Sequence, residues 1–294
     1  MPELPDLAVI ASAFDQALGG RSLRSVTNNE PLVMRGTPTE LAALVGQRLH
    51  AVTRRGKFLT LAFEDGSVII NPMLTGRLGL TILPAKQAAP KTALVMRFGP
   101  REEGAPIVGN VADHWPGGAP WLPHEVDQVE IRYRDTTRMG KVYVVPPGVR
   151  RPVAGWDEQG PDADDPDLDL ESWRRRIKAH RGELKALLRN QAFVAGIGNA
   201  YADEILWQAR LAPFRARPAL ATDEVDRLYE STRTVLSWAV AELRQRVPPR
   251  FETEVRDFLR VHRRGGEPCP RCGTAISEIA PGGFVTSFCR ACQA

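Results

Sequence analysis

The spacing of apolar residues predicts a helix near the start of the chain. Over residues 5–18 apolar side chains recur every three or four positions, as on the buried face of a helix. Pro5 suits the first helical position, and Gly19-Gly20 supplies a stop. Glu3 is therefore expected just outside the beginning of a helix.

Alternating apolar and polar residues then predict β-strands. Residues 59–63 and 68–70 flank an Asp-Gly turn, the signature of a hairpin, and residues 129–134 alternate again. Proline and glycine cluster at 84–128, which indicates a long loop or insertion. The first half of the chain is expected to be mostly β-structure with one leading helix.

Helical spacing dominates the second half. Apolar residues indicate a helical stretch over 173–188, a second helix over 200–208 and a long third helix over 224–246. A second cluster of proline and glycine, at 146–166, marks a domain boundary. A chain of 294 residues is long enough for two domains with separate cores. Because the first half is mostly β-structure and the second half is helical, we expect an α+β protein.

Charge is unevenly distributed behind a formal net charge of +4. Residues 151–171 carry one basic and eight acidic side chains, whereas residues 172–294 carry 21 basic and 13 acidic ones, a local charge of +8. A basic surface of this kind is either simply solvated or binds nucleic acid. Charge by itself does not decide between the two.

The four cysteines form two CxxC pairs, Cys269 with Cys272 and Cys289 with Cys292, separated by 16 residues. No apolar run is long enough to span a bilayer, and the N-terminus lacks the layout of a signal peptide, so we expect a cytoplasmic protein and no membrane partner. Thiols stay reduced in that compartment. One structural Zn²⁺ with four thiolate ligands is therefore expected, and two disulfides are the alternative.

Two further segments are candidates for chemistry. Removal of Met1 before a small residue would expose Pro2 as a secondary amine, a nucleophile beside the carboxylate of Glu3. The alternative is that the prolines only stiffen a helix entry. Gly196-Ile197-Gly198-Asn199 precedes a helix, where backbone N–H groups favour a phosphate, although a tight interhelix turn explains the same residues.

The sequence resembles the formamidopyrimidine-DNA glycosylase and endonuclease VIII family from end to end. The similar segments are, in order, MPELPD at the start, RRGKFL at 54–59, VAGIGNAYADEIL at 194–206, and GGEPCPRCG with CRACQ in the tail. The resemblance implies an N-terminal β-sandwich with a leading helix, and a helical domain with a helix–two-turn–helix and a zinc-finger hairpin. The segments are then 1–146, an acidic linker 147–171, 172–260 and the finger 261–294.

The resemblance also implies a bifunctional DNA glycosylase and abasic-site lyase. The partner would be double-stranded DNA with a damaged base or an abasic site, bound across a cleft between the two domains. The Pro2 nitrogen would attack C1′ of a flipped nucleotide, and β,δ-elimination through the Schiff base would cut the strand. Glu3 matches the catalytic acid and base, and Lys57 matches a lysine that contacts phosphate. Asn199 matches a phosphate-binding asparagine, and Glu204 a carboxylate of the same motif.

Several positions depart from the family pattern. Asn71 stands where a histidine is usual, which removes a cationic contact. The side chains that fill the gap left by a flipped base correspond to Leu74, Thr137 and Met139. Leu74 and Met139 can wedge into a base step, whereas Thr137 cannot replace an arginine, although Arg138 lies beside it.

Two more departures concern the finger and the lesion. Phe284 replaces a phosphate-binding arginine of the finger. Residues 247–258 are short and lack the glycine- and serine-rich stretch that covers an oxidised purine. Oxidised pyrimidines, abasic sites or an unusual lesion are therefore as plausible as 8-oxoguanine.

Three functional hypotheses follow. The first is a monomeric DNA repair enzyme of base excision repair, cytoplasmic and associated with the nucleoid when bound to DNA. The second is a damaged-DNA-binding protein on the same scaffold with weak or no glycosylase activity, because three DNA-handling positions have changed. The third, a zinc-ribbon transcription factor, explains the cysteines but leaves the N-terminus without a role.

Overall fold

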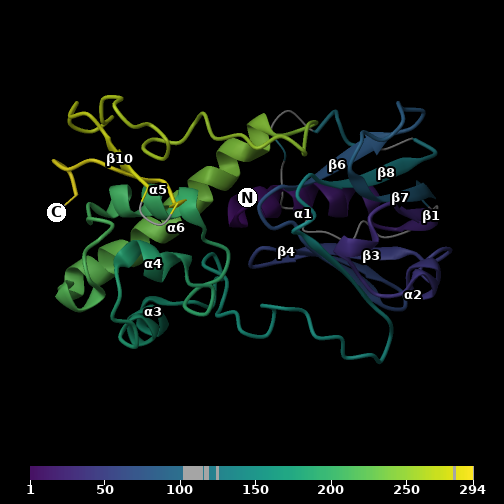
Figure 1. Cartoon of the computed structure of the whole chain (residues 1–294), viewed down its shortest axis with the longest axis horizontal. Coiled ribbons are helices and arrows are strands. Elements are labelled where there is room, and N and C mark those ends of the chain that lie inside the picture. Colours follow the sequence, from purple (N-terminus) through teal and green to yellow (C-terminus); the bar gives the residue numbers. More distant parts are fainter. Residues whose placement is uncertain (102–114, 116–118, 124–125, 281–282, 294) are drawn as a thin grey trace. The chain divides into compact units, whose positions relative to one another are not determined.

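We describe residues 1–101, 115, 119–123, 126–280 and 283–293 of a computed structural model of the chain (Figure 1). The chain divides into two compact units. The first comprises Met1–Ala154 and Leu243–Val255, and the second comprises Gly155–Glu242 and Arg256–Ala294. The predicted four-segment division stays a prediction.

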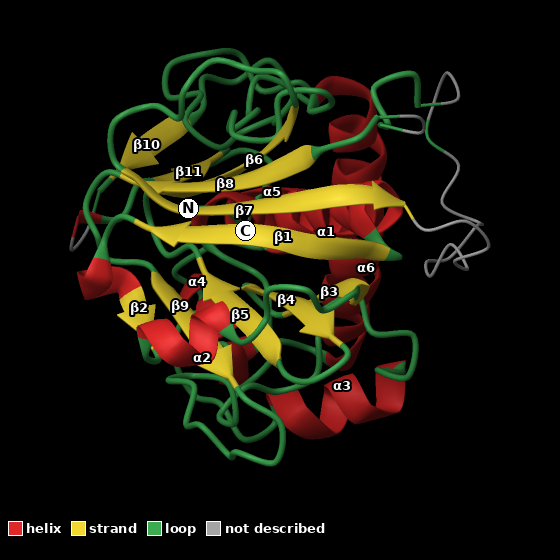
Figure 2. Ribbon diagram, turned by 90° about the vertical axis from the view of Figure 1, so that its right-hand side faces the viewer, coloured by secondary structure: helices red, strands yellow, loops and turns green. Residues whose placement is uncertain are grey.

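The first unit contains a leading helix and two β-sheets (Figure 2). Helix α1 spans Leu4–Leu18, which confirms the predicted helix. The first sheet has the order β1-β7-β8-β6, and all of its neighbours are antiparallel. Its strands are β1 (Arg21–Asn28), β7 (Thr92–Arg101), β8 (Val129–Asp135) and β6 (Gly76–Ile82).

The second sheet has the order β2-β9-β5-β4-β3, with β2 parallel to β9 and the other neighbours antiparallel. Its strands are β2 (Met34–Arg35), β9 (Lys141–Val145), β5 (Ser67–Asn71), β4 (Phe58–Phe63) and β3 (Leu49–Arg55). The short helices η1 (Pro31–Val33) and α2 (Pro38–Ala42) lie between β1 and β3 in the chain. The β4–β5 hairpin confirms the prediction.

The apolar core of this unit lies between the two sheets. Phe63 of β4 and Phe98 of β7 stack across it with ring centroids 6.4 Å apart, and both rings are buried. Strand β7 lies within residues 84–128, where the sequence predicts a long loop or insertion. It forms there because Leu94, Met96 and Phe98 alternate as buried residues between Val95 and Arg97, which are less buried. Residues 102–114, 116–118 and 124–125 of that segment lie outside the described residues.

The second unit is helical and ends in a small hairpin. Its helices are α3 (Leu170–Ile177), α4 (Leu184–Arg189), α5 (Asn199–Ala209), η3 (Arg217–Ala219) and α6 (Thr222–Arg246), the last of which passes into the first unit. Strands β10 (Ser277–Ile279) and β11 (Thr286–Phe288) pair antiparallel. The helical stretch predicted over 173–188 is two helices in the structure. Helix α3 ends at Ile177, and α4 begins at Leu184, after Gly182. These elements confirm the predicted α+β fold.

In the part of the chain that the structure describes, no helix has both the length and the apolar character required to cross a membrane.

Helix α1 is fastened to β3 by a buried carboxylate. Asp15 Oδ1 accepts a hydrogen bond from the backbone N–H of Val52 at 2.7 Å. Burial raises the pKa of Asp15 to about 6, against the opposing effects of the Val52 hydrogen bond and the charge of Arg101. The charged form is therefore disfavoured in the folded state, at a contact that sets the position of α1.

This pKa predicts a pH-dependent loss of stability. Between about pH 4 and pH 6 the native state holds a proton that the unfolded chain releases, so Asp15 favours unfolding as the pH rises. Asp15→Asn keeps an acceptor for Val52. We expect it to be more stable than the wild type by about 2 kcal/mol at pH 7 and about equally stable near pH 4, as measured by urea unfolding.

The matched control is Asp65→Asn in the exposed β4–β5 turn, which should change stability by less than about 0.5 kcal/mol at either pH. A gain for Asp15→Asn that is the same at both pH values would contradict the assigned pKa.

Candidate functional site

The start of α1 places Glu3 inside the protein. Glu3 is the N-cap residue in extended conformation, and its backbone N–H donates to Asp6 Oδ2 at 2.8 Å. This confirms that Glu3 lies just outside the helix start. The side chain of Glu3 is only 3% exposed, and Pro2 beside it is also buried. The helix cap therefore fixes the Glu3 carboxylate and the preceding Pro2 at the start of α1.

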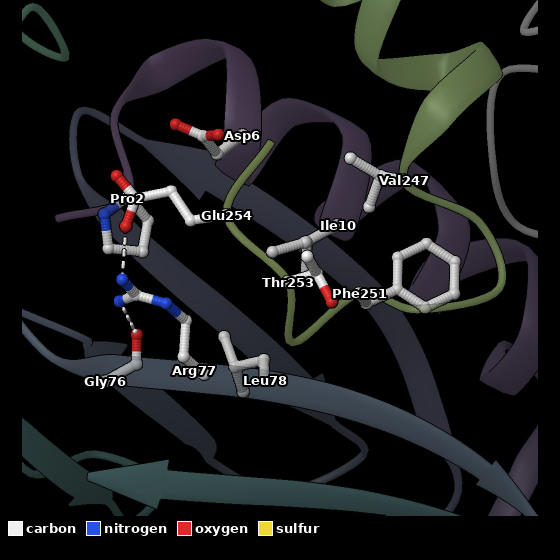
Figure 3. A pocket seen from close by; sticks show the side chains of 10 residues that line it. All are labelled: Pro2, Asp6, Ile10, Gly76, Arg77, Leu78, Val247, Phe251, Thr253 and Glu254. Carbon is white, nitrogen blue, oxygen red and sulfur yellow. Dashed lines mark hydrogen bonds and ion pairs between the residues drawn. The ribbon is translucent and has the colours of Figure 1, made fainter. Parts of the chain in front are cut away.

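A cavity that is partly open to solvent lies beside Pro2 in the first unit (Figure 3). Three elements line it: the first turns of α1, the beginning of β6, and the segment after α6. The lining residues are Pro2, Asp6, Ile10, Gly76, Arg77, Leu78, Val247, Phe251, Thr253 and Glu254. Its walls are thus mainly apolar, with a few charged groups at one end.

An ion pair between Arg77 and Glu254 forms the charged end of this cavity. The Arg77 guanidinium also donates to the carbonyl oxygen of Gly76 at 2.8 Å, which holds it along β6. The N-terminal ammonium group of Met1 lies 3.4 Å from the Glu254 carboxylate. Sequence reasoning missed both members of the pair, since 177 positions separate them and neither belongs to a motif.

Lys57 lies at the tip of the β3–β4 hairpin. It follows Gly56, whose φ of +55° suits a two-residue turn between the paired residues Arg55 and Phe58. Lys57 is half-buried. The tight turn fixes the direction in which the chain presents this lysine.

Leu74 and Met139 are exposed apolar side chains on two connected loops. Leu74 is 47% exposed and Met139 is 44% exposed. Thr75 Oγ1 donates to Asp135 Oδ1 at 2.5 Å and lies 2.6 Å from Thr137 Oγ1. These contacts bring the β5–β6 turn and the β8–β9 loop together, so that both apolar side chains belong to one surface region.

Asp135 organises these loops. It is buried, and it also accepts hydrogen bonds from the backbone N–H groups of Gly140 at 2.7 Å and Thr137 at 3.1 Å. Burial opposes ionisation, but the hydrogen bonds, first that of Thr75, hold the pKa of Asp135 below its usual value. A Cβ at Gly140 would lie 1.9 Å from the Tyr133 hydroxyl, so only glycine fits there.

Two predicted DNA-contact residues have partners within the protein. Arg138, with a φ of +59°, is half-exposed and forms an ion pair with Glu30 at 2.9 Å. Asn71 ends β5, and its Oδ1 accepts the backbone N–H of Met73 at 3.1 Å. Asn71 therefore shapes the turn that carries Leu74, and Arg138 would need to exchange Glu30 for another anion in order to bind phosphate.

In the second unit, Asn199 begins α5 and contacts the finger hairpin. The preceding glycine turn is held by Gln191, whose Oε1 accepts the Gly196 N–H at 2.9 Å. Asn199 Nδ2 donates to the carbonyl oxygen of Val285 at 2.7 Å. The side chain predicted to bind phosphate thus also fixes the hairpin strand.

Glu204 is buried, only 1% exposed, and does not face solvent. Its carboxylate accepts backbone hydrogen bonds from Val261 at 2.8 Å, His262 at 2.9 Å and Arg260 at 3.0 Å. Burial raises the pKa of Glu204, and these hydrogen bonds oppose that rise. Glu204 therefore positions the chain that leads into the finger, and its predicted place among the DNA-binding residues stays a prediction.

Asp203, the neighbour of Glu204, completes this buried polar cluster. Its Oδ1 lies 2.7 Å from Lys185 Nζ, and its Oδ2 lies 2.7 Å from His262 Nδ1 and accepts the Ser287 N–H at 3.2 Å. Asp203 thus connects α4, α5 and strand β11. Sequence reasoning singled out Glu204 but missed Asp203 and Lys185.

The four cysteines meet in one cluster, with all Sγ atoms within 4.8 Å of one another. The Sγ atoms of Cys272 and Cys289 are 3.5 Å apart, and those of Cys269 and Cys292 are 3.9 Å apart. Tetrahedral zinc with Zn–S bonds of about 2.3 Å requires sulfur atoms about 3.8 Å apart. The residues therefore fit one structural Zn²⁺ held by Cys269, Cys272, Cys289 and Cys292.

Comparison with protein families matches three segments of the chain. The formamidopyrimidine-DNA glycosylase N-terminal domain matches residues 1–142, and the H2TH domain of the same family matches residues 159–247. A zinc finger found in FPG and IleRS matches residues 266–294. The chain therefore belongs to the formamidopyrimidine-DNA glycosylase family.

Individual relatives agree. The formamidopyrimidine-DNA glycosylase of Thermomicrobium roseum is 33% identical over 100% of this chain and 99% of its own length. The crystal structure of MutM (Fpg) from Thermus thermophilus has 28% identity and a TM-score of 0.76, covering 99% of this chain and 98% of that one. A complex of Lactococcus lactis Fpg with abasic-site DNA has a similar fold, with 23% identity, a TM-score of 0.79 and 99% of each chain covered.

The zinc site predicts a spectroscopic response. Trp207 Nε1 donates to Cys269 Sγ at 3.4 Å, so loss of zinc changes the surroundings of this indole. In Cys272→Ser, whose altered residue is exposed, we expect loss of bound zinc and a shift in tryptophan emission. Metal analysis and fluorescence measure both. Trp207→Phe is the control that should lack the shift, and a Cys272→Ser protein that keeps its full zinc content would contradict the ligand set.

Glu204 predicts a loss of stability. Glu204→Gln keeps the shape of the side chain but replaces one carboxylate oxygen by an NH₂ group. A backbone N–H that donates to this oxygen in the wild type then faces another donor and loses its hydrogen bond. We expect a loss of about 2 kcal/mol in the free energy of unfolding. The exposed Glu267→Gln in the same unit should cost less than about 0.5 kcal/mol. Equal stability of the two variants in urea would show that the three backbone hydrogen bonds contribute nothing measurable.

Proposed function

We propose that this chain is a bifunctional DNA glycosylase and abasic-site lyase that acts on damaged double-stranded DNA. The observation that carries the proposal is that Pro2, the chain neighbour of the buried Glu3, lines a cavity that is partly open to solvent. Membership of the family supports it. So do the complexes of Lactococcus lactis Fpg with abasic-site DNA and with Fapy-dG DNA, which indicate the class of partner.

The reaction begins with removal of Met1, which leaves Pro2 with a secondary amine. This nitrogen attacks C1′ of the flipped nucleotide, and the bond from C1′ to the damaged base breaks. Glu3 protonates the sugar ring oxygen, so the sugar opens and an iminium links it to Pro2. Loss of a proton from C2′ then expels the 3′ phosphate, a further elimination expels the 5′ phosphate, and water releases the amine.

The other predicted residues would hold the DNA. Lys57 contacts phosphate near the lesion, and Asn71, Arg138 and Asn199 contact the backbone. Leu74 and Met139 enter the gap left by the flipped base as apolar wedges, which their exposure on two connected loops allows. The finger needs its zinc for folding, and the metal takes no part in the chemical steps.

The lesion pocket would differ from one closed by a flexible glycine-rich loop. The short segment after α6 contributes Val247, Phe251, Thr253 and Glu254 to the cavity wall. A base entering the cavity would meet apolar side chains and the Arg77–Glu254 ion pair. Activity on duplexes with oxidised purines, oxidised pyrimidines or abasic sites identifies the preferred class.

A second candidate function is damaged-DNA binding with weak or no glycosylase activity. Asn71, Thr137 and Phe284 favour it, because cationic contacts are absent at these three positions. Equal affinity for damaged and intact duplexes, with no nicking of any lesion, would support this alternative.

The central test is borohydride trapping of the Schiff base on an abasic-site duplex, with the mature N-terminus established by mass spectrometry. We expect a covalent adduct at Pro2. Glu3→Gln should keep its affinity for DNA while base release falls about 10²- to 10⁴-fold, because a positioned proton donor is lost.

Glu64→Gln, an exposed carboxylate of the same unit, is the matched control and should leave both steps unchanged. No adduct from a protein that begins at Pro2 would refute the enzymatic proposal. Unchanged base release by Glu3→Gln would remove Glu3 from the mechanism.

A further inference from the structure

Phe284 lies exposed at the edge of the finger hairpin, just before β11, with 50% of its side chain accessible. The guanidinium of Arg189, the last residue of α4, lies over the Phe284 ring, 3.9 Å from the centroid. A cation at this distance from an aromatic face is attracted by the ring quadrupole. The exposed ring of Phe284 therefore holds the positively charged guanidinium of Arg189 from helix α4.

The position of Arg189 follows from how α4 meets the hairpin. Lys185 and Arg189 are four residues apart on α4 and share one face of the helix. Lys185 Nζ donates to the carbonyl oxygen of Val285 at 2.7 Å and to Thr286 Oγ1 at 2.9 Å. One turn further on, the same face carries Arg189 to Phe284. The contact is thus fixed by the register between helix and strand.

The N–H donors of Arg189 have no oxygen acceptor in the part of the chain that the structure describes. Among the described residues no hydrogen bond or ion pair engages its guanidinium, whereas Arg174 pairs with Asp226 and Arg215 with Glu224. The contact with the Phe284 ring requires none of these donors to be given up to an oxygen acceptor. A planar fork of this kind matches two oxygens of a phosphate.

The surroundings also favour an anion. Asn199 Nδ2 binds the carbonyl oxygen of Val285, the residue after Phe284, so the first turn of α5 adjoins the same strand. The positive end of this helix therefore lies close to the stacked pair. We propose that Arg189, positioned by Phe284, binds a DNA backbone phosphate and supplies from α4 the charge that the hairpin itself lacks at position 284. This inference rests on the proposed function, because it takes DNA as the partner.

The test is the salt dependence of binding to a short undamaged duplex, measured by fluorescence anisotropy with the zinc-loaded full chain. Arg189→Met keeps an apolar side chain over Phe284 and removes only the charge. Its slope of log K against log salt concentration should fall by about 0.9, the value of one phosphate contact, and binding should weaken similarly on all sequences.

Three further variants sharpen the test. Arg175→Met on α3, an exposed arginine of the same unit, should leave the slope within error of the wild type. The double variant Arg189→Met with Phe284→Arg should recover the lost slope. Phe284→Ala should weaken binding by less than Arg189→Met, because the charge remains but is no longer held in place.

The outcomes separate this inference from the proposed function. A wild type that binds duplex DNA with a steep salt dependence, together with an unchanged slope for Arg189→Met, would overturn the role of Arg189 and leave the enzymatic proposal intact. A wild type without measurable binding to intact or damaged duplexes would overturn both. Equal zinc content and equal thermal unfolding of Arg189→Met and the wild type establish that the finger is folded in the variant.

Discussion

The arrangement of the second unit depends on two adjacent buried carboxylates, Asp203 and Glu204. A charge inside a protein is tolerated only when ion pairs or hydrogen bonds replace the water it has lost. Three backbone N–H groups satisfy Glu204, and Lys185 with His262 satisfies Asp203. The zinc-finger hairpin is therefore held to the helical motif by groups that cannot separate without leaving a buried charge unpaired. Because Lys185 is one of these groups, the same constraint sets where Arg189 meets Phe284.

In the first unit, buried carboxylates hold in position the reactive and apolar groups that are proposed to act on DNA. Helix capping buries Glu3 beside Pro2, and the contact of Asp15 with β3 holds the helix that carries them. Asp135 ties together the two loops that display Leu74 and Met139. In both places a carboxylate acts through hydrogen bonds to neighbouring backbone or hydroxyl groups. Groups proposed to act on DNA are thus positioned by short contacts between neighbouring elements of the first unit.

The three positions that depart from the family pattern, Asn71, Thr137 and Phe284, have different surroundings in the structure. Asn71 shapes a turn through its hydrogen bond to Met73, and Thr137 joins the hydrogen-bond group of Asp135. Neither replaces the charge that is absent. Phe284 differs, because the Arg189 guanidinium of helix α4 lies over its ring. The same loss of charge in the sequence therefore has a local structural substitute at one position of the three.

The sequence by itself determined the elements and chemistry whose signals are local. The leading helix, the β4–β5 hairpin, the glycine turn before α5 and the CxxC pairs all depend on neighbouring residues, and family motifs extended them to Pro2, Glu3 and Lys57. Only the tertiary structure decided which distant residues meet. Arg77 and Glu254, or Arg189 and Phe284, carry no motif, and each pair is joined because separate elements pack in a particular register. Glu204 was found from a motif, but its burial depends on residues 260–262, which no local pattern connects to it.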